Sequence, residues 1–419
     1  MKNTKLIIDS MNDVTAVLSP LKNQIKSNRK SISRILHFFS FINDFRDKTK
    51  IKYKLENILC ICLLISMRGE FTSFFNAAVF IKVKKTYFEK LGLIENNEIP
   101  SHDTLRRIFM YIDANDLRDV ILKRINLLIE KITNHLNKNN KVRLISGDGK
   151  TFNGSGRKDN KRNVNVFNIL DASKAICMTS IPLDDKESEI TQFQRMLRYY
   201  NLQNTIVTAD ALHCHIGTAR IITDKKGEYL LKVKDNNESL KKEIIFRLEN
   251  HKDKIIKEKY NQCDYEILFL WDSYLGCEYP NIKAYIKMNS HKRIKQKDYN
   301  PEDQFFISSS NNKDLILEAV DNRWEIEGDF HWFKDDFSKE DECTFTDKNA
   351  IQVMATFNNI TYAFYRLASA IFDDQIMAET RIRYKDSPEK MLYKLVPLLE
   401  KQNLAMLLKQ NMRGLIKKQ

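Results

Sequence analysis

Two short apolar segments each lead to an aspartate, and carboxylates in such places can bind a divalent cation. The first segment, residues 142–145, leads to Asp148, which has a glycine on either side. The second, residues 205–209, ends at Asp210. Flanking glycines leave the backbone uncrowded, so a hydrated metal ion or a bulky anion can approach. The pair suggests a cation site, although either aspartate alone could equally begin a turn or cap a helix.

A third acid lies in the segment 323–334, which is dense in residues that can do chemistry. On a helix turning about 100° per residue, one face carries Arg323, Glu327, His331 and Lys334. That face places a carboxylate beside cations, as a phosphate-directed site needs. A plain surface ion pair of Arg323 with Glu327 is the alternative, and it would contribute only a few tenths of a kcal/mol. Four aromatic residues in and beside the segment argue against a fully exposed helix: Trp324, Phe330, Trp332 and Phe333.

The elements that must position these acids form an α/β pattern. We expect strands at 142–148, 164–172, 175–183, 205–210 and 228–233, with helices at 187–200 and 211–224. Three strands in hairpin order, followed by alternating helix and strand, predict a mixed sheet rather than a doubly wound parallel one. A strand is expected again from Gln304, and one long helix from Lys313 to Phe337.

The pattern predicts three domains. Residues 1–140 form an N-terminal helical domain, which is the candidate DNA-binding domain. Residues 141–372 are predicted to form the α/β core that carries these acids, interrupted by a strand-rich basic insertion at 235–301. Residues 373–419 form a C-terminal helical tail.

Within the first domain, one apolar segment and one helix start stand out. Residues 58–67 are apolar but span about half of the ~20 residues that a membrane crossing needs, so they predict a buried helix. Residues 100–109 begin with Ser101 or Asp103 as a helix cap. This helix could enter a DNA-reading helix-turn-helix, or it could simply pack in a helical bundle.

Composition favours a polyanionic partner. The 419 residues carry a net charge of +14, with 42% hydrophobic and 30% charged residues. Clustered lysines and arginines can displace counterions from phosphates, although a solvated lysine-rich surface looks the same. The basic run at 287–297, which includes Lys292 and Arg293, is either a solvated loop or a DNA-backbone contact, and its one-sided charge favours DNA.

The cysteines and histidines suggest no structural metal or disulfide framework. Seven cysteines, an odd number without a CxxC pair, are typical of reduced cytoplasmic thiols. His213 and His215 flank Cys214 and invite a zinc interpretation, but no second ligand cluster completes it.

Several motifs occur together in a fixed order. They are Asp148-Gly-Lys-Thr151, Lys186-Glu-Ser-Glu-Ile190, Thr208-Ala-Asp-Ala-Leu-His-Cys214, Leu231-Lys-Val-Lys-Asp-Asn236, Phe306-Ile-Ser-Ser309, Arg323-Trp-Glu-Ile-Glu327 and His331-Trp332, preceded by Asp44-Phe-Arg46 and Pro100-Ser-His-Asp-Thr104. As a set they resemble bacterial insertion-sequence transposases of the DDE type, in the group of H-repeat-associated proteins. The resemblance covers residues from about 40 to 370.

The resemblance implies an RNase H-like core in which Asp148, Asp210 and Glu327 bind two Mg²⁺ (or Mn²⁺) ions and catalyse DNA cleavage and strand transfer. The cations that would hold the DNA near these acids are Arg323, Lys334, His331, Lys150 and Lys234, with Lys292 and Arg293 in the insertion. The sequence departs from the wider pattern at three positions: Val320 replaces a tyrosine, Asn153 an arginine and His215 a glutamine. We assign no role to Glu187 or Glu189 beyond starting a helix.

The resemblance also implies the partners. They are the double-stranded terminal repeats of the element, target DNA and a second copy of the chain, since two ends must be brought together. The protein would then be cytoplasmic and associated with the nucleoid. An inactive or domesticated transposase that only binds DNA is the alternative function.

The sequence predicts which of two neighbouring glutamates is catalytic. Glu325 and Glu327 point about 200° apart on a helix, and Glu327 shares its face with Arg323 and Lys334. Glu327→Gln should therefore abolish Mg²⁺-dependent cleavage, whereas Glu325→Gln should leave it. The reverse result in a cleavage assay would contradict this assignment.

Overall fold

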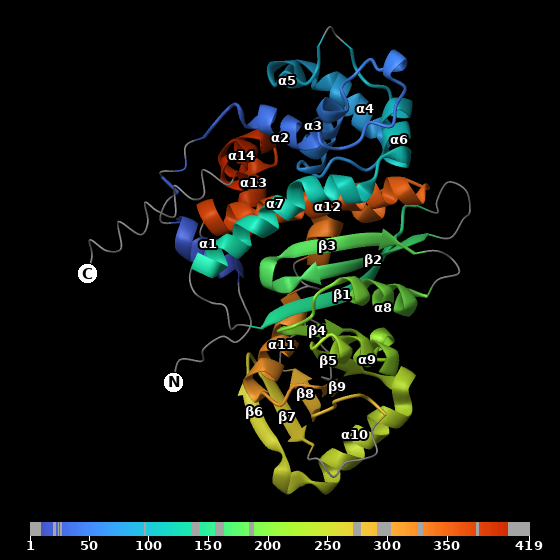
Figure 1. Cartoon of the computed structure of the whole chain (residues 1–419), viewed down its shortest axis with the longest axis vertical. Helices are drawn as coiled ribbons and strands as arrows, with labels where there is room; N and C mark the ends of the chain where they lie inside the picture. Colours follow the sequence, from blue (N-terminus) through green and yellow to red (C-terminus); the bar gives the residue numbers. More distant parts are fainter. Residues whose placement is uncertain are drawn as a thin grey trace, which may run out of the picture.

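The structure is a computed structural model of the chain, drawn in Figure 1. It describes residues 10–19, 22–23, 25, 27–95, 98–135, 142–155, 163–183, 188–270, 278–290, 303–325, 330–373 and 377–400.

The described residues up to 135 form mainly helices, as predicted. The helices are α1 (Ser10–Leu18), α2 (Ser31–Phe39), α3 (Leu55–Ser66), α4 (Phe74–Val83), α5 (Lys85–Lys90), α6 (His102–Tyr111) and α7 (Ala114–His135). The predicted buried helix is α3, in which ten of the twelve residues are buried. Ser101 caps α6 through its hydroxyl oxygen, which accepts from the Thr104 N–H at 3.2 Å. Whether α6 belongs to a helix-turn-helix stays a prediction.

A nine-stranded mixed sheet follows, and its first five strands have the RNase H-like order. They are β1 (Arg143–Phe152), β2 (Val164–Asp171), β3 (Ile176–Pro182), β4 (Thr205–Ala209) and β5 (Glu228–Val233). In space they run β3-β2-β1-β4-β5. The first three strands pair antiparallel, while β1, β4 and β5 pair parallel. The predicted mixed sheet is therefore confirmed.

The remaining strands extend the same sheet. They are β6 (Ile256–Tyr260), β7 (Cys263–Phe269), β8 (Ala284–Ser290) and β9 (Gln304–Ser308). The strand β9 pairs antiparallel with both β5 and β8, so the described strands of the predicted insertion continue the core sheet. The stretch predicted as a strand-rich insertion, 235–301, contains β6, β7 and β8 in its described part, together with helix α10 (Glu238–Asn250), which was not predicted.

Helices cover the two faces of the sheet (Figure 1). The helices α8 (Glu189–Tyr199), α9 (Ile216–Asp224) and α10 share one apolar core with the face that carries Ile145, Val207 and Leu231. On the opposite face, α11 (Lys313–Glu325) packs over Leu144 and Ile206.

Two predicted helices differ from the structure in detail. The expected helix at 211–224 is a 3₁₀ turn, Ala211–His213, followed by α9 from Ile216. The predicted helix from Lys313 is α11 up to Glu325, residues 326–329 lie outside the described part, and Phe333–Phe337 form a π-helix.

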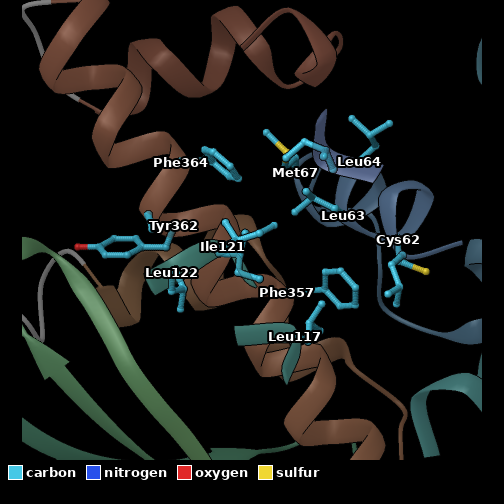
Figure 2. Packing of buried hydrophobic residues seen from close by; sticks show 14 of the residues in the cluster. Cys62, Leu63, Leu64, Met67, Leu117, Ile121, Leu122, Phe357, Tyr362 and Phe364 are labelled. Carbon is cyan, nitrogen blue, oxygen red and sulfur yellow. The ribbon is translucent and has the colours of Figure 1, made fainter. Parts of the chain in front are cut away.

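The C-terminal helices complete the core of the N-terminal ones. They are α12 (Lys348–Ala368), α13 (Met377–Tyr384) and α14 (Pro388–Leu395). Figure 2 shows Phe357 and Phe364 of α12 packed among α3 and α7, and α12 also contacts β3. The predicted boundaries near residues 140 and 372 stay predictions, but α12, predicted within the catalytic core, belongs to the same apolar cluster as the first helices. Among the described helices, none combines the length and apolar character that a bilayer crossing requires.

The end of α3 gives a stability prediction. Gly69 and Gly92 have φ of 68° and 71°, so alanine at either position is strained by about 1–2 kcal/mol. Only at Gly69 would the new Cβ also overlap the carbonyl oxygen of Phe337, which adds roughly 1–3 kcal/mol. Thermal unfolding should therefore show a larger loss for Gly69→Ala than for Gly92→Ala. Equal losses would contradict this packing.

Candidate active site

Strand pairing brings the two predicted aspartates together. The parallel register of β1 and β4 sets Gly147 opposite Ala209, so Asp148 and Asp210 each follow a paired residue. Side chains alternate between the two faces along a strand, so Asp148 lies on the α11 face with Leu144. Asp210 is the next residue after β4, and the same alternation puts it on the α11 face with Ile206. Their side chains are 31% and 45% exposed, and a solvated ligand can reach both.

Local packing explains why a glycine precedes Asp148. A Cβ on Gly147 would lie 2.5 Å from Phe193 and 2.8 Å from Phe167. These rings fill the α8 face directly below the strand, so a side chain at 147 would push β1 away from them. Asp210 is fixed differently, because its Oδ1 accepts the N–H of Leu212 at 3.1 Å and caps the 3₁₀ turn.

The histidine predicted to lie near the acids contacts one of them. His331 Nδ1 lies 3.3 Å from Asp148 Oδ2. Burial, together with the positive charges of Lys334 and Lys150, lowers the pKa of His331 to about 4. At neutral pH the imidazole is therefore uncharged, and an Nδ1–H tautomer can donate to Asp148.

The third predicted acid is Glu327, in the segment after α11. Glu327 lies outside the described residues, and the side chain of Glu325 is not described. The assignment of Glu327 rather than Glu325 stays a prediction. Among the described residues, α11 covers the face that carries Asp148, and Phe330 directly precedes His331.

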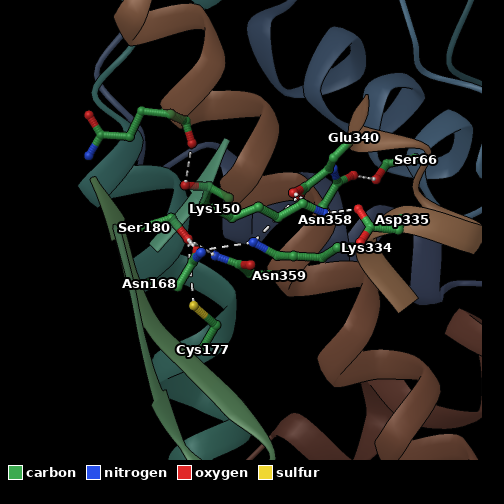
Figure 3. Close-up of polar contacts among 12 residues, drawn as sticks. Ser66, Lys150, Asn168, Cys177, Ser180, Lys334, Asp335, Glu340, Asn358 and Asn359 are labelled. Carbon is green, nitrogen blue, oxygen red and sulfur yellow. Dashed lines mark hydrogen bonds and ion pairs between the residues drawn. The ribbon is translucent and has the colours of Figure 1, made fainter. Parts of the chain in front are cut away.

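Two of the predicted DNA-binding lysines lie in a buried polar network (Figure 3). Lys334 is fully buried, with its Nζ 3.5 Å from Glu340 Oε1 and 3.0 Å from Asn168 Oδ1. Lys150 contacts Asp335 and lies 3.5 Å from Glu340 Oε2. In this conformation both ammonium groups are engaged by protein acids, and their contact with DNA stays a prediction.

The network reaches from strands β1 and β2 to the helices α3 and α12. Asn168 of β2 stands opposite Asp148 in the β1–β2 register, and its Oδ1 also accepts from Ser180 at 2.6 Å. At the other end, Asn358 of α12 donates to Glu340 at 3.0 Å and accepts from Ser66 of α3 at 3.0 Å. Sequence reasoning missed Glu340 and Asn168, because neither has a spacing pattern that links it to the acids.

The other predicted cations are placed as follows. Arg323 is 4% exposed, and its guanidinium carbon lies 5.9 Å from the centre of the Phe306 ring. Lys234 is exposed directly after β5, the parallel neighbour of β4. Lys292 and Arg293 lie outside the described residues.

Two further residues, not assigned by sequence, lie beside the aspartates. Glu189 begins α8, and its Oε1 lies 3.1 Å from Nε2 of the fully buried His213. The only sequence signal for Glu189 was its place in the motif at 186–190, which did not reveal its contact. His213, one of the two histidines considered as zinc ligands, is thus paired with a carboxylate.

Comparisons with known proteins agree with this geometry. A family model described as "Transposase DDE domain" matches residues 135–364, more than half of the chain. A second model, described as "DDE_Tnp_1-associated", matches residues 36–124.

The chain belongs to the DDE transposase domain family.

Relatives in Escherichia coli K12 include the protein YbfL, 24% identical over 351 residues, and the H repeat-associated protein YhhI, 23% identical over 351 residues. Each match covers 78% of this chain and 89% of the relative. The resemblance inferred from the motifs is therefore confirmed. The piggyBac transposase in a synaptic complex with hairpin DNA aligns over 98% of this chain and 83% of its own, at 11% identity and a TM-score of 0.37, and likeness at that level supports no structural argument.

The DDE transposase family uses divalent metal ions, and the donors in this chain suit them in part. Asp148 and Asp210 offer carboxylate oxygens, the ligands that Mg²⁺ and Mn²⁺ prefer, on one accessible face. Within the described residues, no group of three or more His, Cys, Asp or Glu side chains is arranged to hold a metal ion.

The buried network gives a prediction with a matched control in the same 3₁₀ turn, Glu340–Glu342. Glu340→Gln removes the buried carboxylate charge shared by Lys334 and Lys150, and breaking such a pair lowers stability by about 3–5 kcal/mol. Glu342 is 60% exposed and forms a surface ion pair with Lys339, so Glu342→Gln should change stability by less than about 1 kcal/mol. Chemical denaturation should separate the two variants. Similar stabilities would show that the network contributes little.

Proposed function

We propose that this DDE transposase cleaves DNA at the ends of an insertion sequence and joins those ends to target DNA. Asp148, Asp210 and Glu327 would bind two Mg²⁺ or Mn²⁺ ions. The observation that carries the proposal is the parallel pairing of β1 with β4, which sets Asp148 and Asp210 side by side. Membership of the DDE transposase family supports the general part of this proposal, namely that the protein is a transposase.

The chemistry requires charge stabilisation at a phosphate. Phosphodiester cleavage and strand transfer are in-line displacements that add negative charge to an already anionic group. Divalent ions held by Asp148, Asp210 and Glu327 would supply the positive charge that stabilises this phosphate as its charge builds up. The chain's own contribution is to hold the carboxylates in place. Strand β1 carries Asp148, the N–H of Leu212 in the 3₁₀ turn holds Asp210, and a neutral His331 with its proton on Nδ1 would donate to Asp148.

The proposed DNA contacts follow the exposure of the cations. Lys234 is exposed at the end of β5, and we place a backbone contact there, with Lys292 and Arg293 as further candidates in the insertion. Lys150, Lys334 and Arg323 are mostly buried. While Lys150 and Lys334 are paired with Glu340, their role would be to stabilise the protein around the site. They would contact a phosphate only after these ion pairs break.

The proposed partners are double-stranded terminal repeats, target DNA and a second copy of the chain. The net charge of +14 supports a nucleic-acid partner, and the need to bring two ends together supports a homodimer. Such a protein would work in the cytoplasm, at the nucleoid.

The test compares acidic-residue variants on the element's own terminal repeats. Asp148→Ala and Asp210→Ala should each reduce Mg²⁺-dependent cleavage by on the order of a thousandfold or more, because several kcal/mol of transition-state stabilisation are lost. Their affinity for the same DNA in gel-shift assays should stay within a few fold. Asp253→Ala, at an exposed position in a distant turn, is the control and should cleave normally.

Two other outcomes are informative. Normal cleavage by either aspartate variant would sink the proposed site. Wild-type protein that binds the repeats but never cleaves them would favour the alternative, a transposase-derived protein that only binds DNA.

A further inference from the structure

The turn that carries Asp210 is anchored through a buried histidine. His213 ends the 3₁₀ turn after Asp210 and is fully buried. Its ring lies edge-on to Phe167 and Phe193, with centroids 5.3 Å and 4.8 Å away. Its Nε2 lies 3.1 Å from Glu189 Oε1 and 4.0 Å from Asp210 Oδ1. With the ring proton on Nε2, His213 can donate a hydrogen bond to this oxygen of Glu189.

Glu189 also lies against β1, the strand that carries Asp148. A Cβ on Gly149, the residue after Asp148, would lie 2.5 Å from Glu189 Oε1 and 2.7 Å from Oε2. The carboxylate therefore occupies the space that a side chain at position 149 would fill. One side chain from the start of α8 thus meets the backbone beside Asp148 and, through His213, the turn that begins at Asp210.

Other side chains hold the Asp210 turn without reaching β1. Asn236 Nδ2 donates to the Ala211 carbonyl at 2.8 Å, and the Tyr279 hydroxyl donates to the Cys214 carbonyl at 2.9 Å. Both anchors come from segments beyond β5. They hold the turn against the part of the chain that follows β5, whereas the contact of Glu189 with His213 holds the turn against β1.

We propose that Glu189 and His213 form a positioning pair that sets Asp210 relative to Asp148. The inference rests on the proposed function, because the spacing of the two aspartates matters through the ions that they share. The pair acts by hydrogen bonding and packing, and the charge of Glu189 is not itself required. Residues that orient metal ligands in this way typically change metal affinity 10–100-fold when they are removed.

The test measures Mn²⁺ affinity of the full-length protein by isothermal titration calorimetry, without DNA. Glu189→Ala removes the hydrogen bond, and His213→Phe removes it while keeping an aromatic ring between Phe167 and Phe193. Both should bind Mn²⁺ about 10–100-fold more weakly than wild type. Glu189→Gln keeps an acceptor for His213 and should stay within about threefold. Since Glu189 is partly exposed, its variants test the pair even if His213→Phe does not fold.

Gln194 provides the matched control on the same helix. Its side chain donates to Thr218 of α9 at 3.2 Å, so Gln194→Ala disturbs the packing of α8 without reaching the aspartates. It should leave Mn²⁺ affinity unchanged at a melting temperature comparable to that of Glu189→Ala. If Gln194→Ala lost as much Mn²⁺ affinity as Glu189→Ala, the role of Glu189 would be only structural and the proposal would be overturned.

The remaining outcomes separate this inference from the proposed function. Wild-type affinity in Glu189→Ala and His213→Phe would overturn the positioning pair alone. A Glu189→Gln variant as weak as Glu189→Ala would show that the charge matters, and would overturn it in favour of a metal ligand. Wild-type protein that binds Mn²⁺ but does not cleave DNA would overturn the proposed function alone, and wild-type protein without measurable Mn²⁺ affinity would overturn both.

Discussion

The site depends on the parallel register of two short strands. Gly147 stands opposite Ala209, and a slip of one residue would turn one aspartate to the other face of the sheet. The register is held from below, where Phe167 and Phe193 pack so closely under Gly147 that no side chain fits. It is also held from the sides, by the antiparallel pairing of β1 with β2 and the parallel pairing of β4 with β5. Apolar packing on one face thus fixes the carboxylates on the other.

The lysine–glutamate network extends this rigidity into the helical half. Lys334 and Glu340 are both fully buried, and buried charges are tolerated only when paired and hydrogen-bonded. Their partners come from β1, β2, the 3₁₀ turn and α12, so any shift of one element leaves a buried charge without its partner. Strand β1 and the N-terminal helices are therefore joined by polar contacts that depend on geometry, as well as by apolar packing that tolerates small shifts.

Much of this arrangement could be predicted from sequence because the signals are local. The strands near Asp148 and Asp210 are short apolar runs bounded by turn residues, and Ser101 begins a helix as its side chain predicts. The face shared by His331 and Lys334 followed from helical periodicity, yet the chain forms a π-helix there, and Lys334 is buried against Glu340. The contact of Glu189 with His213 joins residues 24 positions apart through the packing of α8 on the sheet. Such contacts arise from tertiary structure, and no local pattern in one sequence encodes them.

The core shared by the two ends of the chain has a consequence during synthesis. The hydrogen bond between Ser66 and Asn358 joins residues 292 positions apart, and the apolar side chains around Leu63 pack against α12 (Figure 2). At roughly 5–20 residues per second, the ribosome needs on the order of 15–60 s after α3 is made to synthesise α12, against which α3 packs. During that interval α3 exposes one of the most apolar segments of the chain. A transcript truncated before α12 would therefore yield an aggregation-prone fragment instead of a separate DNA-binding module.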